Sequence, residues 1–230
     1  MDNLDFERHY EEKGFSSQRR YPNEQLIQFL AEHFFSVPKA QRKRIKCLEV
    51  GCGSGANIWM IAKEGFDTYG IDIAPTSIRL CKKMLHYWKV NANVKKGNMR
   101  ALPFEDCFFD AVVDVLSVEH TDLNGHKEAY DEIFRCLKKG GKFFSWHLGT
   151  NSDNFRRGGG RKLDLLTIDN APNPKVPYRN NGLTCFLTQA TARRMLSVAG
   201  FRDIVIERVM RTYENMTQKV EYFSIQALKP

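Results

Sequence analysis

A short apolar segment followed by alternating glycines is the feature of this sequence that most restricts its fold. Residues 45–50 predict a strand, and Gly51, Gly53 and Gly55 follow it directly in the run GCGSG. Glycine permits a tight turn and a close approach of the backbone to a ligand. A helix over about residues 56–63 comes next, so the segment predicts a strand–loop–helix unit that is typical of nucleotide-binding α/β proteins.

Predicted strands and helices alternate over the first two thirds of the chain. The strands are 68–73, 92–96, 109–118 and 142–148, and the helices are 22–36, 76–88 and 125–137. Pro22 is expected in the first turn of the first helix, and Gly140–Gly141 are expected to close the last. The alternation predicts a doubly wound parallel sheet. After residue 187, a helix over 188–199 capped by Thr188 and a hairpin of strands 203–209 and 220–228 complete the pattern.

The segment 150–187 interrupts this order. It is polar, rich in Gly, Asn and Pro, and has no clear periodicity, and such a long segment inside a compact domain is usually functional. We therefore expect a single domain over residues 1–230. Its parts are an N-terminal helical cap (1–44), a cofactor-binding core (45–149), a lid or acceptor insertion (150–187) and a C-terminal helix and strand hairpin (188–230).

Composition limits the classes of protein that need to be considered. The six cysteines form no CxxC pair and match no zinc spacing, so no metal site is predicted. No apolar run approaches the roughly 18 residues that span a bilayer, and the N-terminus is charged throughout. We expect a cytoplasmic protein without membrane contact. The net charge of +8 favours acidic partners such as phosphates, carboxylates or nucleic acid.

Two carboxylates near the glycines indicate the ligand. Asp72, at the end of the second strand, can accept hydrogen bonds from both hydroxyls of a ribose. Gly51, Gly53 and Ala56 also match the dinucleotide pattern G-x-G-x-x-G/A. Glu49, two residues before the first glycine, distinguishes the two ligands. It would repel a pyrophosphate, whereas it favours the ammonium and sulfonium groups of S-adenosylmethionine.

Four segments together resemble those of class I S-adenosylmethionine-dependent methyltransferases, of the small-molecule group that includes ubiquinone and sugar methyltransferases. They are LEVGCGSG (48–55), YGIDIAPTSI (69–78), GNMRALPFEDCFFDAVVD (97–114) and CLKKGGKF (136–143). The resemblance implies a Rossmann-like seven-stranded mixed sheet with helices on both faces and an antiparallel last strand. It also implies S-adenosylmethionine as the cofactor and S-adenosylhomocysteine as the product.

The resemblance also implies cofactor-binding residues. The methionine moiety would lie against Glu49 and the glycine loop, with Gly51, Cys52, Gly53 and Gly55. Asp72 would bind the ribose, Ile73 would pack on the adenine, and Asn98–Met99 would lie at the adenine edge. The family commonly has Asp at the position of Asn98, and an amide can still accept a hydrogen bond there. Leu116 and Ser117 would flank the transferable methyl group. By position, Arg20 and Tyr21 would reach the methionine carboxylate or cover the cofactor.

Catalytic and acceptor residues are expected past the ends of the later strands. His147 and His120 are the candidate bases, because histidine titrates near neutral pH and both follow predicted strands. In segment 150–187, Arg156, Arg157 and Arg161 bracket three glycines, and Tyr178 and Arg179 follow. These five residues are the candidate acceptor-binding set, and they suggest a lid that closes over an anionic acceptor.

These observations predict methyl transfer to an oxygen, or a nitrogen, of a small polar metabolite that carries an anionic group. An RNA or protein methyltransferase is the first alternative, because the chain is basic. A separate recognition domain and RNA-binding signatures are missing from the sequence, so nucleic acid is not the expected partner. A non-catalytic S-adenosylmethionine-binding protein is the second alternative.

Overall fold

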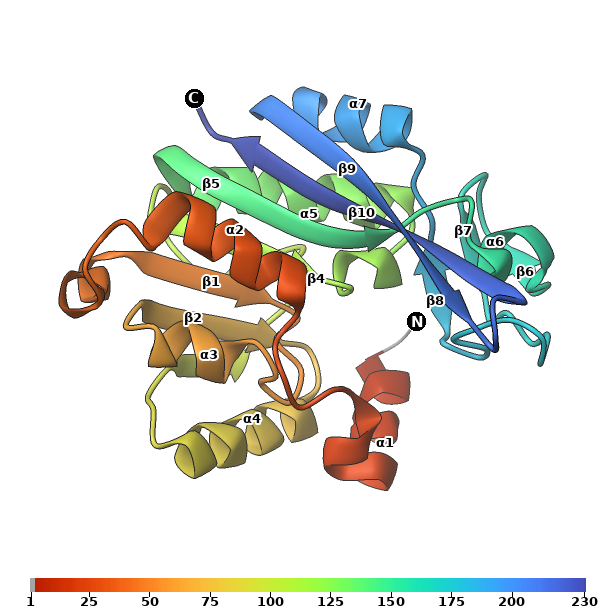
Figure 1. Cartoon of the computed structure of the whole chain (residues 1–230), viewed down its shortest axis with the longest axis horizontal. Helices are drawn as coiled ribbons and strands as arrows, with labels where there is room; N and C mark the ends of the chain where they lie inside the picture. The colour runs from red at the N-terminus through yellow and green to blue at the C-terminus, as the bar shows by residue number, and fades with distance from the viewer. Residues whose placement is uncertain (1–2) are drawn as a thin grey trace.

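One seven-stranded sheet forms the centre of the protein, whose residues 3–230 are described by a computed structural model (Figure 1). The strand order is β3-β2-β1-β4-β5-β10-β9. Strands β1 to β5 run parallel, and β10 runs antiparallel to both β5 and β9. The predicted mixed sheet with an antiparallel last strand is confirmed. The strands are β1 (Lys46–Val50), β2 (Asp67–Asp72), β3 (Asn93–Lys96), β4 (Phe109–Val115), β5 (Leu137–Leu148), β9 (Arg202–Tyr213) and β10 (Gln218–Leu228).

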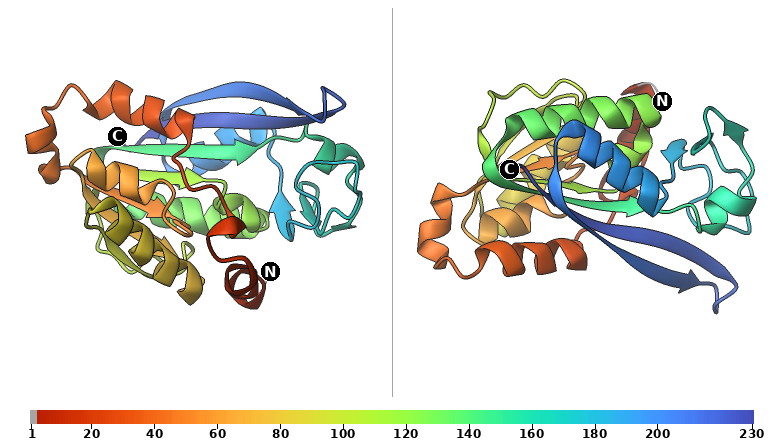
Figure 2. Two further views of the ribbon diagram at one scale, coloured as in Figure 1. Left: turned by 60° about the horizontal axis from the view of Figure 1, so that its bottom comes forward. Right: turned by 90° about the horizontal axis from the view of Figure 1, so that it is seen from above.

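Helices cover both faces of this sheet (Figure 2). Side chains of β4 alternate between the faces, as the twofold period of a strand requires. Val112 packs in the cluster that contains Tyr130 and Leu196, and Val113 packs in the cluster that contains Phe29 and Ile61. This double cover explains the continuous apolar sequence of β4. The helices that supply these clusters are α2 (Glu24–Phe34) and α3 (Ile58–Lys63) on one face, and α5 (Leu123–Cys136) and α7 (Gln189–Ala199) on the other.

The ends of three helices test the capping predictions. Thr188 caps α7 by accepting a hydrogen bond from Thr191 N, as predicted. Helix α2 starts later than predicted: Asn23 caps it, so Pro22 lies before the helix and not in its first turn. The prediction that Gly140–Gly141 close α5 is wrong. Helix α5 ends at Cys136, and the two glycines form a bulge in β5, where their backbone pairs with Lys229.

The segment 150–187 is more regular than its sequence suggests. It contains the short helix α6 (Asp153–Arg157) and a three-stranded antiparallel sheet of β6 (Arg161–Lys162), β7 (Thr167–Asp169) and β8 (Leu183–Cys185). This unit lies beyond the carboxyl end of β5 (Figure 2). Strands of two or three residues are too short to produce a detectable period, which explains why the sequence did not predict them.

The N-terminal segment packs near the first turn of α4 (Pro75–Trp88), which follows β2. It comprises α1 (Asn3–Lys13) and the 3-10 turn η1 (Gly14–Ser17). Tyr10 packs with Ala74 and Leu80, and Glu7 accepts a hydrogen bond from Thr76 N (2.9 Å) at the start of α4. A second 3-10 turn, η2 (Lys39–Arg44), connects α2 to β1. No helix within residues 3–230 is both long and apolar enough to cross a membrane.

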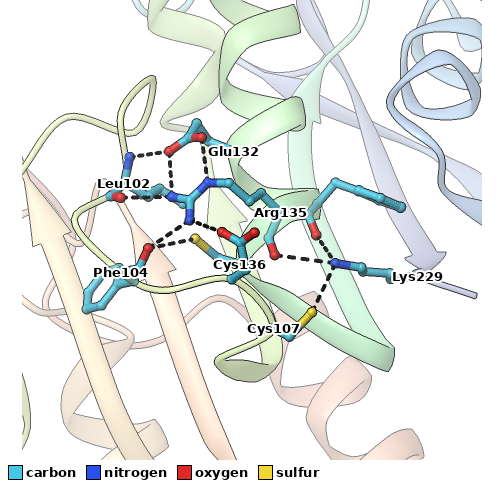
Figure 3. Close-up of polar contacts among 9 residues, drawn as sticks. Leu102, Phe104, Cys107, Glu132, Arg135, Cys136 and Lys229 are labelled. Atoms are coloured by element: carbon cyan, nitrogen blue, oxygen red, sulfur yellow. Dashed lines mark hydrogen bonds and ion pairs between the residues drawn. The ribbon is translucent and has the colours of Figure 1, made fainter.

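Arg135 of α5 fixes the loop that follows β3 (Figure 3). Its guanidinium donates to Phe104 O (2.8 Å) and Leu102 O (3.0 Å), and Glu132 accepts from Leu102 N (2.7 Å). Hydrogen bonds that involve charged groups are among the stronger ones in proteins. They hold the backbone just after Asn98 and Met99, the two residues that were predicted to lie at the adenine edge.

Candidate functional site

A cavity of about 1360 Å³ opens at the carboxyl ends of the parallel strands. Its wall combines residues that follow β1, β2 and β4 with residues of the N-terminal segment, of β5, of segment 150–187 and of the β9–β10 hairpin. Ligands of open α/β sheets bind at this edge. The predicted cofactor residues that line the cavity are Gly51, Asp72, Ile73, Asn98, Met99, Leu116 and Ser117. Their individual roles stay predictions.

The glycine loop has the backbone conformation that its sequence requires. Gly51, Gly53 and Gly55 all have positive φ angles. A Cβ atom on Gly51 would lie 1.5 Å from Ser117 Oγ, so only glycine fits there. Asp72 holds the loop from the neighbouring strand, accepting hydrogen bonds from Gly53 N (2.8 Å) and Ala74 N (2.9 Å). Cys52 does not line the cavity; its backbone N donates to Ile71 O (2.8 Å) and joins the loop to β2.

Glu49 lies behind the loop and is almost fully buried, at 2% exposure. Its Oε1 accepts from Asn57 Nδ2, whereas Oε2 has no hydrogen-bond partner in the described part of the chain. Burial raises the pKa of Glu49 to about 8. A buried, unpartnered carboxyl oxygen is costly and calls for a functional explanation. Glu49 does not itself line the cavity, but a carboxyl group just behind the loop favours a cationic ligand group such as the ammonium of the methionine moiety, so the residues present fit S-adenosylmethionine.

The N-terminal segment closes over the glycine loop, which the sequence did not reveal. Gln18 donates to Ser54 Oγ (2.7 Å) and accepts from Tyr10 OH (3.2 Å). Arg19 also lines the cavity, and its guanidinium donates to Asn57 Oδ1 (3.3 Å).

Arg20 and Tyr21 lie outside the cavity, contrary to the prediction. Tyr21 is 66% exposed and packs edge-on against Trp59 and Trp88. The chain turns outward after Arg19, so the sequence pattern located the right segment but the wrong residues.

The two candidate histidines occupy different environments. His120, in the 3-10 turn η3 (Val118–His120), lines the cavity, and its Nδ1 donates to Leu183 O (2.9 Å). His147 is fully buried, lies outside the cavity, and has its Nε2 2.9 Å from His126 Nε2. Burial lowers the pKa of His147 to about 3. Because His147 cannot reach an acceptor in the cavity, its predicted role as a base is wrong.

Most of the predicted acceptor-binding arginines are also displaced from the cavity. Arg156 donates to Asn151, Arg157 pairs with Asp153 (2.8 Å) and Arg161 pairs with Asp169 (3.3 Å). Arg179 does not line the cavity either. These side chains are held by neighbours within their own segment, so a lid built on them does not fit the structure.

Tyr178 is the member of the predicted acceptor set that lines the cavity. Its hydroxyl lies 2.7 Å from Tyr222 OH and 2.9 Å from Tyr213 OH, and the latter two hydroxyls are 3.0 Å apart. Burial raises the pKa of Tyr178 to about 12, so the phenol stays neutral and can donate a hydrogen bond. Arg211, whose guanidinium is 5.2 Å from the centre of the Tyr213 ring, lines the same part of the cavity. It has no ion-pair partner among the described residues.

Leu116 and Ser117 line the cavity directly after β4. Leu116 has φ 59°, a left-handed conformation that is unusual for a leucine. Such conformations persist only where the surrounding structure enforces them, and they concentrate at functional sites. Ser117 lies directly against Gly51. Among the described residues, no cluster of His, Cys, Asp and Glu side chains is arranged to hold a metal ion.

Comparison with known proteins agrees with this geometry. Residues 48–145 match the model of the methyltransferase domain family. A sterol 24-C-methyltransferase of Schizosaccharomyces pombe is 30% identical over 152 residues, which are 62% of this chain and 39% of that protein. A sterol 4-C-methyltransferase of Caenorhabditis elegans is 28% identical over 48% of this chain and 33% of that protein. The chain thus spans well under half the length of these relatives.

Solved structures share the fold at lower identity. A methyltransferase of Methanosarcina mazei described as S-adenosylmethionine-dependent has a TM-score of 0.66 and 21% identity, covering 80% of this chain and 92% of that one. The phosphoethanolamine N-methyltransferase 2 of Haemonchus contortus, solved with S-adenosylmethionine, has a TM-score of 0.67 and 15% identity. The match covers 100% of this chain and 57% of that one.

Residues 48–145 therefore match a methyltransferase domain, and the chain shares the fold of structures described as S-adenosylmethionine-dependent methyltransferases. The finer resemblance to ubiquinone and sugar methyltransferases is not confirmed, because the sequence relatives described above act on sterol carbon atoms.

Proposed function

We propose that the protein transfers the methyl group of S-adenosylmethionine to an oxygen or nitrogen of a small polar acceptor that carries an anionic group. The observation that carries this proposal is the composition of the cavity. One half holds the glycine loop and Asp72, which suit the cofactor. The other half is lined by Tyr178, Tyr222 and Arg211, and Tyr213 lies behind them, hydrogen-bonded to both tyrosine hydroxyls. A guanidinium without an ion-pair partner favours a phosphate or carboxylate.

Carbon methylation of a sterol is the second candidate, because the curated relatives carry that name. The wall of the acceptor half weighs against it. A sterol would bring the Arg211 guanidinium and His120 Nε2 against apolar surface and leave these polar groups without partners, which is costly.

Methyl-labelled S-adenosylmethionine tests the proposal directly. The purified protein would be incubated with a panel of phosphomonoesters, carboxylates, their uncharged analogues, a sterol and an RNA oligonucleotide. We expect label in an anionic small molecule and much less in its uncharged analogue. Label in the sterol or the RNA alone would contradict the proposal.

Arg211→Ala is expected to raise the KM for the anionic acceptor by about 10- to 100-fold, which corresponds to the loss of one charge-assisted hydrogen bond. Binding of S-adenosylhomocysteine should stay unchanged, because Arg211 lies in the acceptor half. Arg194→Ala, an exposed arginine on α7, is the matched control and should retain the wild-type KM. Equal KM values for the two variants would show that Arg211 does not contact the acceptor.

A further inference from the structure

Glu119 is a second buried carboxyl group whose partners do not account for it. It lies in η3, is 2% exposed and lines the cavity. Its Oε2 has no hydrogen-bond partner in the described structure. A buried acidic oxygen without a donor is costly, and such exceptions in folded proteins usually have a functional reason.

Asp114, five residues earlier, is a buried acidic residue with a structural role and can be compared with Glu119. It is also fully buried, but it accepts hydrogen bonds from Ser117 N (3.0 Å), Val118 N (3.0 Å) and Ser145 Oγ (2.7 Å). These bonds fix the turn after β4. Glu119 has only a backbone donor, from Leu148, and its Oε2 has none, although it belongs to the same turn. The difference indicates that the Glu119 carboxyl serves the cavity rather than the fold.

The nearest side chain does not supply the missing donor. His120 Nε2 lies 3.8 Å from Glu119 Oε1, which is too far for a hydrogen bond. His120 Nδ1 faces the carbonyl oxygen of Leu183, so Nδ1 carries the ring proton. Burial lowers the pKa of His120, so the ring is neutral and Nε2 is itself an acceptor. Once Glu119 is ionised, the cavity presents two neighbouring acceptors, and a ligand N–H or O–H group would fit both.

We propose that Glu119 receives the proton that the acceptor loses on methylation, with His120 orienting the protic group. This inference rests on the proposed function. The acceptor's lone pair forms the bond to the methyl carbon, the carbon–sulfur bond breaks with its electron pair left on sulfur, and the proton passes from the acceptor heteroatom to the Glu119 carboxylate, which lines the cavity. His147, buried away from the cavity, has no part in this step.

The electrostatics of the site suit this role. Burial raises the pKa of Glu119 well above its ordinary value, and the nearby Asp114 raises it further. A carboxyl with a raised pKa is a better proton acceptor. A bound sulfonium cation in the same cavity favours the ionised form, and its charge disappears when the methyl group leaves. The titratable groups on the surrounding elements are Asp114, His120, Asp122, His147 and Cys185.

Calorimetry with S-adenosylmethionine and S-adenosylhomocysteine, in buffers of different ionisation enthalpy, measures the protons released on binding. The wild type should release more protons on binding S-adenosylmethionine, which carries the sulfonium charge, than on binding S-adenosylhomocysteine, which does not. Glu119→Gln keeps the side-chain shape but cannot ionise, so it should lose much of that difference while retaining its affinity for S-adenosylhomocysteine. Glu105→Gln, an exposed residue outside the cavity, should behave as the wild type does. The same proton release from Glu119→Gln and wild type would overturn the proposal.

The turnover number measured with the acceptor that the labelling screen identifies is a second test of the proposed role of Glu119. Glu119→Gln should lower kcat on the order of 10²–10⁴-fold, the usual contribution of a positioned base. Glu119→Asp keeps a carboxylate and should retain more activity than the isosteric glutamine, which a purely structural role would not produce. Near-normal kcat in Glu119→Gln would also overturn the inference. Failure of the wild type to bind either ligand would instead refute the proposed function itself.

Discussion

Acidification from pH 7 to pH 4 is expected to destabilise the wild-type protein more than a variant that lacks the buried pair His126 and His147. The two Nε2 atoms are 2.9 Å apart and both side chains are fully buried. His147 Nδ1 donates to Leu148 O (2.9 Å), so its Nε2 is free to accept the proton of His126 Nε2. His126 Nδ1 lies 2.8 Å from Thr121 Oγ and 2.9 Å from Asp122 O, and with Thr121 as the donor to this nitrogen both rings are neutral. Burial accordingly lowers their pKa values to about 4 and about 3.

The sign of the effect follows from linkage. An unfolded histidine binds a proton near pH 6.5, whereas the folded pair stays neutral until a much lower pH. The contribution of the neutral pair to the free energy of unfolding is therefore fully present above about pH 6.5 and is lost as the pH falls towards 4. The loss should amount to about 3 kcal/mol or more at pH 4. Denaturant unfolding at a series of pH values measures it.

A comparison of wild type and variant is needed because buried carboxyl groups act in the opposite direction. Burial raises the pKa of Glu49 to about 8 and that of Asp114 to about 6, so these groups favour the folded state as pH falls. The double variant His126→Gln, His147→Gln retains both carboxyl groups. Its unfolding free energy should fall less steeply with acid than that of the wild type. Parallel curves for the two proteins would show that the histidine pair is not neutral in the folded state.

Gly51→Ala is expected to lower the affinity for S-adenosylmethionine on the order of 10²-fold, the typical effect of a displacement of about 1 Å in a ligand site. Gly51 has φ 65°, and the new Cβ atom would lie 1.5 Å from Ser117 Oγ and 2.4 Å from Ser117 Cβ. Either the loop or Ser117 must move, and both line the cavity. Calorimetric titration of the variant measures the loss.

Gly140→Ala is the matched control for the backbone cost of that change. Gly140 has φ 76°, but a Cβ atom there would meet nothing within 4 Å. Gly140→Ala should lose roughly 1–2 kcal/mol of stability, because alanine is forced into a left-handed conformation, and Gly51→Ala should lose at least as much. Only Gly51→Ala should lose cofactor affinity. Equal affinity in the two variants would mean that the contact between Gly51 and Ser117 does not shape the site.

The sheet and the glycine loop could be predicted from the sequence because local chemistry determines them. A buried strand, alternating glycines and a helix start lie within 20 consecutive residues, from 45 to 63, and Asp72 ends the next strand. The lid arginines were misplaced for the opposite reason. Their charges are compensated by Asn151, Asp153 and Asp169, which are close in sequence but can be identified as partners only from the folded segment.

The remaining parts of the site depend on contacts between distant segments. Gln18 meets Ser54 across 36 residues, and Tyr178 meets Tyr222 across 44. No pattern within either segment signals such a pairing. Glu119 is adjacent to His120 in the sequence, but only the folded structure shows that its Oε2 has no hydrogen-bond donor, which is the observation that suggests a functional role. Sequence periodicity locates elements, but it does not tell which buried polar atoms are satisfied.

The central claim is that the cavity at the glycine loop is built for S-adenosylmethionine rather than for a dinucleotide. Glu49 behind the loop and Asp72 beside it are the residues on which this claim depends. The most direct measurement is a calorimetric titration of the purified protein with S-adenosylhomocysteine and, separately, with NAD⁺. We expect saturable one-site binding of S-adenosylhomocysteine and no heat of binding with NAD⁺. Binding of NAD⁺ without binding of S-adenosylhomocysteine would contradict it.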